Sequence, residues 1–152
     1  MPLLLAFILI AASPRQSNIS SGPYNPTLAK TDLATQAADV GNTTIYAVTN
    51  AGSYGVTCYV VVTQAATTSS NLPPCRVTWT DSDSNVSNTF SMTIANAGNT
   101  VGATGLTGTA ESLAVIQAKA GTNIQMSTSG YASTGATPMQ FALHAKVWFI
   151  GQ

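Results

Sequence analysis

The chain has 152 residues, the usual size of one domain with a substantial core. Charged residues make up only 7% of it, against about 25% in an ordinary soluble domain, and five basic residues balance five acidic ones. A chain without net charge attracts a phosphate backbone weakly, so we expect no nucleic-acid partner. Because hydrophobic residues reach 45% and lie in strand-like runs, disorder is excluded from about residue 40 onward.

Ser and Thr together form about a quarter of the residues, a composition that favours strands over helices. A surface so poor in charge is typical of β structures that neighbouring copies cover. We therefore expect a chain that associates with itself.

Residues 1–13 form an apolar segment, with an unbroken apolar run at 3–12. The run is shorter than the roughly 20 residues that a membrane-spanning helix needs, so we expect no stable membrane span. Its length fits a signal-peptide core, with small residues Ala12 and Ser13 near a cleavage point, although no Lys or Arg precedes it. Two interpretations stay open: a signal that is removed, or an arm that remains and docks into a neighbouring subunit.

Residues 14–40 are predicted to be a linker or arm. The first part, to Tyr24, is rich in Ser, Asn, Gly and Pro. Over residues 27–40, the apolar spacing with Asp32 in the first turn allows a short helix, and an extended arm fits as well. The sequence does not choose between these two.

Residues 41–152 are predicted to be a β-sandwich domain. A short strand at 45–48 precedes a long one at 54–64, which lies centrally because both of its faces carry apolar residues. The last strand, at 139–150, alternates apolar and other residues and places His144 opposite its apolar stripe.

Two hairpins are expected within this domain. The first joins residues 76–80 to 86–95 through a turn rich in Asp, Ser and Asn. The second joins 113–118 to 123–127 through a tight turn in which Gly121 supplies a positive φ. About seven strands with such turns predict an all-β, two-sheet sandwich of jelly-roll type with an apolar N-terminal arm.

Three segments carry a resemblance: Gly52-x-Tyr54-x-Val56 at the start of the long strand, residues 118–124, and the ending Phe149-Ile150-Gly151. Over about residues 40–152, the chain resembles the jelly roll of the complement globular-head and tumour-necrosis-factor-like group. The segments 59–83 and 121–131 are also similar to β domains associated with phage fibres. The resemblance implies a domain that trimerises through its sheets and serves attachment or assembly.

The residues that carry chemistry are few. His144 is the sole histidine, so a histidine metal cluster is impossible and a catalytic triad has one candidate base. Asp81-x-Asp83-x-Asn85 mimics the start of a calcium loop, but Val86 stands where that loop needs Gly and Met92 where it needs Glu. These residues are better explained as a hairpin turn. We therefore expect no enzyme, no metal site and no cofactor.

Cys58 and Cys75 are the only thiols and a candidate disulfide. A simple hairpin register across residues 65–74 leaves them offset along the strands, so two buried free thiols are the alternative. Four aromatic residues could form an interface or a sugar-binding platform, and packing in the core or between subunits is the more ordinary role. They are Tyr59, Trp79, Tyr131 and Trp148.

The sequence as a whole favours a non-enzymatic structural subunit that forms a trimer or larger array. We expect it on a virion, as a tail- or head-fibre or decoration protein, or on an extracellular or cell surface, with other virion or cell-surface proteins or glycans as further partners. The alternative is a secreted carbohydrate- or receptor-binding β-sandwich module, for which Tyr131 and Trp148 are the aromatic candidates.

Overall fold

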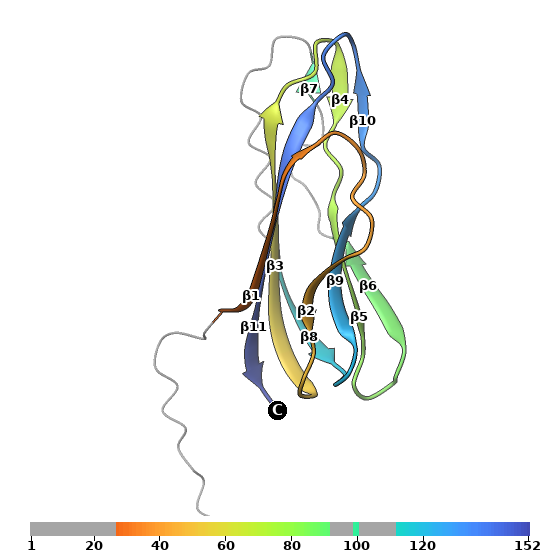
Figure 1. The fold of residues 1–152 in the computed structure, drawn as a ribbon. Helices are drawn as coiled ribbons and strands as arrows, with labels where there is room; N and C mark the ends of the chain where they lie inside the picture. The colour runs from red at the N-terminus through yellow and green to blue at the C-terminus, as the bar shows by residue number, and fades with distance from the viewer. Residues whose placement is uncertain (1–26, 92–98, 101–111) are drawn as a thin grey trace, which may run out of the picture.

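The computed structural model describes residues 27–91, 99–100 and 112–152, and the described part is all-β (Figure 1). The predicted apolar segment at 1–13 lies outside the described residues. In chain order the strands are β1 (Thr27–Gln36), β2 (Thr43–Ala47), β3 (Gly52–Gln64), β4 (Ser69–Asn71), β5 (Cys75–Thr80), β6 (Ser87–Ser91), β7 (Asn99–Thr100), β8 (Ser112–Ala118), β9 (Asn123–Thr128), β10 (Ala132–Thr134) and β11 (Gln140–Gly151).

Two four-stranded antiparallel sheets face each other along the length of the domain (Figure 1). Sheet A has the order β1-β11-β3-β8 and sheet B the order β2-β9-β5-β6. Three short strands form a small end sheet in the order β10-β4-β7. Among the remaining eight strands, the first (β1) pairs with the last (β11), and the second (β2) pairs with the last but one (β9). This order is that of a jelly roll, so the predicted two-sheet sandwich is confirmed.

The core lies between sheets A and B, where the inward residues of each strand alternate with outward ones. Central strand β3 and its neighbour β11 contribute most of the buried core side chains, as the alternation of apolar residues along them predicts. Fully buried side chains on these two strands are Tyr54, Val56, Cys58, Val60, Phe141, Leu143, Ala145 and Val147. Sheet B meets them with Val77 of β5 and Ile124 and Met126 of β9, which are also fully buried.

Residues 27–36 form a strand, so the extended alternative holds there and the helix does not. β1 pairs with β11 along most of its length, with Asp32 opposite His144 and Leu33 opposite Leu143. Leu33 packs against the core, and this contact draws the strand into sheet A. Sheet A therefore begins at Thr27, ahead of residue 41, where the sequence analysis placed the start of the sandwich.

The predicted hairpin of residues 113–127 is wrong. β8 pairs with β3 in sheet A, whereas β9 pairs with β2 and β5 in sheet B, so the turn at 119–122 crosses between the sheets. Gly121 does have the expected positive φ, at 76°. Both strands direct alternate apolar residues toward the same core. This sequence pattern is the same whether the two strands pair in a hairpin or lie in opposite sheets.

The hairpin of β5 and β6 is confirmed, and the predicted residues beyond Ser91 in its return strand lie outside the described part. Its turn is closed by Asp81, whose Oδ1 accepts hydrogen bonds from the backbone N–H groups of Asp83 and Ser84 and from the Ser84 hydroxyl. Asn85 adopts a positive φ of 58°, as asparagine tolerates. The Asp81 carboxylate thus stabilises the hairpin turn by accepting these hydrogen bonds.

Candidate functional site

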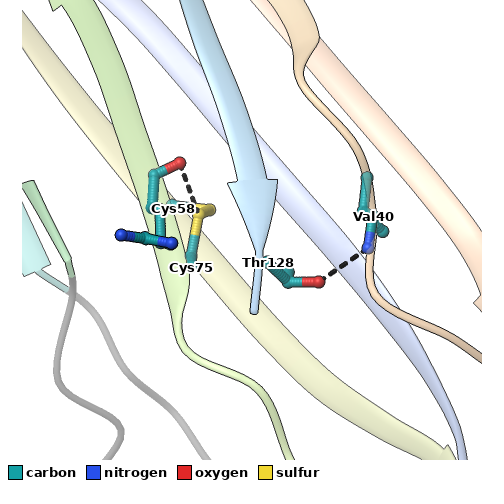
Figure 2. The surroundings of a disulfide bond; sticks show 5 residues. Val40, Cys58, Cys75 and Thr128 are labelled. Atoms are coloured by element: carbon teal, nitrogen blue, oxygen red, sulfur yellow. Dashed lines mark hydrogen bonds between the residues drawn. A yellow bond between two sulfur atoms is a disulfide. The ribbon is translucent and has the colours of Figure 1, made fainter. Parts of the chain in front are cut away.

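Cys58 and Cys75 form a disulfide with a Cα separation of 6.4 Å (Figure 2). Cys58 lies on β3 in sheet A and Cys75 on β5 in sheet B, so the bond joins the two sheets across the core. The offset expected from a hairpin register does not arise, because these strands face each other instead of pairing edge to edge.

The four aromatic candidates are not brought together. Tyr131 packs against Phe141 and donates its hydroxyl hydrogen bond to the Met139 carbonyl at 2.7 Å, and Trp79 packs against the core. The other two, Tyr59 and Trp148, lie on the outer face of sheet A but at separate levels along the strands. A single platform of all four is therefore excluded.

An open hollow of about 510 Å³ lies on the outer face of sheet A. We call it the sheet A pocket; strands β1, β11 and β3 line it. Its polar side chains are Lys30, Asp32, Thr57, Tyr59, His144 and Lys146.

The pocket is built as two cross-strand rows, because paired residues of antiparallel strands lie side by side on the same face. One row is Asp32, His144 and Tyr59, and the other is Lys30, Lys146 and Thr57. Alternation turns all six outward, since the residues between them on β11 and β3 are buried in the core.

Asp32 is the electrostatic centre of the pocket. Its carboxylate accepts hydrogen bonds from the Lys30 ammonium at 2.7 Å and from His144 Nδ1 at 2.5 Å. The hydrogen bond from Lys30 and then that from His144 hold the pKa of the Asp32 carboxyl below its ordinary 3.8. The Tyr59 ring stacks on the imidazole with centroids 5.7 Å apart. Asp32 thus orients His144 and leaves its Nε2 for another partner.

A paired aspartate and histidine also occur in hydrolytic sites, where a nucleophile must hydrogen-bond to the second imidazole nitrogen. Within the described ranges, no hydroxyl or thiol makes that contact, and the neighbouring Cys58 is held in the disulfide. The same part of the chain contains no group of three or more His, Cys, Asp or Glu placed to hold a metal ion. The pocket thus presents an imidazole nitrogen beside two lysine side chains.

Sequence analysis singled out His144 and Tyr59 but missed Lys30, Asp32 and Lys146. Lys30 and Asp32 stand two apart on β1, a spacing that places them on one face of a strand. That signal is present in the sequence, but the pairing of β1 with β11, more than a hundred positions away, is not.

A second feature of the same sheet face is apolar. Leu113 and Val115 on edge strand β8 expose 59% and 63% of their surface, while the alternate residues Ala114 and Ile116 face the core. Val115 pairs with Gly55, over which the Trp148 ring lies. We call Leu113, Val115 and Trp148 the β8 patch.

The geometry defines a disulfide-linked jelly roll with a polar pocket and an apolar patch on one outer sheet face. Neither protein-family models nor curated proteins nor solved structures match this chain. In the described ranges, no helix has the length and apolar character needed to cross a membrane.

Proposed function

We propose that this chain is a non-enzymatic structural subunit that assembles with copies of itself into a trimer or larger array on a virion or an extracellular surface. The observation that carries the proposal is the β8 patch. Leu113 and Val115 are the most exposed large hydrophobic side chains among the described residues. Adjacent apolar side chains left open to water are typical of protein interfaces.

The position of the patch supports association with another copy. β8 is the edge strand of sheet A, and its outer side is bridged to the β5–β6 turn at Gln117 and Ala118. Over Leu113 to Ile116, no strand of the described part pairs with that side. Monomeric proteins commonly protect such an edge with charged residues or proline. The described side chains of β8, at 113–118, include neither. A second subunit can cover both the edge and the β8 patch.

The disulfide supports an extracellular or particle-surface location, because such bonds persist in oxidising surroundings. The low charge content of the chain supports contact with other subunits over much of its surface. The resemblance to fibre-associated and complement-head-like domains points in the same direction. In those groups the domain serves attachment or assembly.

The alternative of a carbohydrate-binding module built on Tyr131 and Trp148 has less support. Tyr131 packs against the core through Phe141, and the Trp148 ring covers Gly55. These contacts use the two rings for packing.

The test compares the wild-type chain with Leu113→Thr/Val115→Thr by size-exclusion chromatography with light scattering. Threonine keeps the β propensity of the strand and removes apolar contact area. We expect the wild type to be oligomeric and the double variant to shift toward a monomer. Val86→Thr, at an exposed valine of the β5–β6 turn, is the matched control and is expected to leave the mass unchanged. A monomeric wild type would refute the proposal. An unchanged mass for the double variant would show that the β8 patch is not the contact between subunits.

A further inference from the structure

The sheet A pocket contains an arrangement that the fold itself does not favour. Lys30 on β1 and Lys146 on β11 are direct cross-strand partners. Two like charges opposite each other destabilise a sheet. The whole chain has only five basic residues, and two of them meet here. The pairing therefore calls for an explanation other than stability.

The acid in the pocket does not neutralise both lysines. The Asp32 carboxylate is engaged by Lys30 and by His144. Within the described residues, no carboxylate lies at ion-pair distance from Lys146. Two ammonium groups and one carboxylate leave the pocket with a net positive charge even when His144 is neutral. An anion placed between the two lysines would remove their repulsion.

The rest of the lining favours an anion that also carries hydroxyl groups. Tyr59 and Thr57 present hydroxyls beside the charges, and the Nε2 atom of His144 is free to accept or donate a hydrogen bond. Sites for phosphate commonly add clustered backbone N–H groups to their cations. Here the backbone N–H groups belong to the sheet ladder. A volume of about 510 Å³ has room for one sugar ring.

We infer that the sheet A pocket binds a carboxylate-bearing sugar, such as a terminal uronic or sialic acid of a glycan. The sugar carboxylate lies between Lys30 and Lys146, and its hydroxyls meet Thr57, Tyr59 and His144. This inference goes beyond the proposed assembly function and does not depend on it. Because the pocket is open, the affinity of one site is expected in the millimolar range. An assembled array would raise the avidity by displaying many copies.

The experiment is saturation-transfer difference NMR on the full chain, which works for an assembly of any size. The probes are glucuronic acid and N-acetylneuraminic acid, with glucose, acetate and inorganic phosphate as comparisons. We expect saturation transfer to at least one acidic sugar, and affinity about tenfold weaker for glucose and for acetate. Equal binding of acetate or phosphate would overturn the inference in favour of a simple anion site. Equal binding of glucose, or no signal from either acidic sugar, would overturn it as well.

Variants locate the binding. Lys146→Gln is expected to weaken binding of the acidic sugar about tenfold, because one charge-assisted contact is lost. Lys119→Gln, on the turn between β8 and β9, removes the same charge elsewhere and is expected to bind like the wild type. Equal weakening in both variants would show a general charge effect and overturn the site. The titration is repeated on Leu113→Thr/Val115→Thr, so that a failure of self-association and a failure of sugar binding are seen separately.

Discussion

The disulfide between Cys58 and Cys75 connects the two sheets of the sandwich, and both residues are only 1% exposed. The bond closes the segment that leaves sheet A through β3, passes β4 and enters sheet B at β5. It therefore holds together the two layers whose contact forms the core.

Removing this bond should destabilise the domain without changing its topology. The sequence separation is 17, and closing a loop of about that length is worth about 3 kcal/mol in the chain-entropy account. We expect Cys58→Ala/Cys75→Ala to lower Tm by about 6–12 °C. Differential scanning calorimetry of the variant, and of the wild type with and without reductant, measures the change. Equal Tm values for the oxidised and reduced wild type would contradict this account.

Thr128 on β9 is the buried polar side chain among the described residues, at 6% exposure. Its hydroxyl accepts a hydrogen bond from the Val40 N–H at 2.8 Å (Figure 2). The same hydroxyl donates a hydrogen bond to Asp39 Oδ1. Thr128→Val keeps the shape and leaves the Val40 N–H unpaired, so we expect a loss of about 1–3 kcal/mol in the free energy of unfolding. Urea denaturation measures it. Thr63→Val, at an exposed strand position, is the control, and equal effects in the two variants would count against this role.

Trp148 lies so close over Gly55 that a Cβ atom there would come within 2.2 Å of the indole ring. Gly55→Ala must displace the ring, and we expect a cost of about 1–3 kcal/mol. Tryptophan emission and urea denaturation report the displacement and its cost. Gly41→Ala is the matched control, because nothing lies within 4 Å of its Cβ position, and it is expected to unfold like the wild type or slightly later. An unchanged unfolding curve for Gly55→Ala would show that the ring is not held there.

The Asp32 carboxyl should titrate below its ordinary pKa of 3.8, because Lys30 and then His144 donate hydrogen bonds to its charged form. A depressed pKa in the folded state contributes stability above the ordinary value, and this contribution is lost as the pH falls through the folded value. Lys30→Met should raise the Asp32 pKa, and His144→Gln should raise it less. Carboxyl-carbon NMR titration measures both. A wild-type pKa at or above 3.8 would rule out these contacts in solution.

Much of the sandwich follows from alternation along single strands. The apolar faces of β3 and β11, and the outward position of His144, are visible because side chains alternate with a period of two. The pairing of β8 and β9 was predicted wrongly, since a turn between two half-buried strands has the same pattern whether the strands pair or face each other. Strand partners are set by the whole chain.

The site was less predictable than the fold for the same reason. Lys30 and Asp32 become pocket residues only when β1 pairs with β11, and the stretch 27–40 also carries an apolar spacing that fits a helix. The contact of Leu33 with the core, which selects the strand, is made at long range. The disulfide was a candidate from the sequence, but its role across the sheets required the topology.

The central claim, that the subunits associate with one another, is tested most directly by sedimentation velocity of the full oxidised chain over a micromolar concentration series. A boundary with the mass of a trimer or a larger assembly, persisting on dilution, is the predicted result. A single 15.6 kDa species at every concentration would contradict the claim.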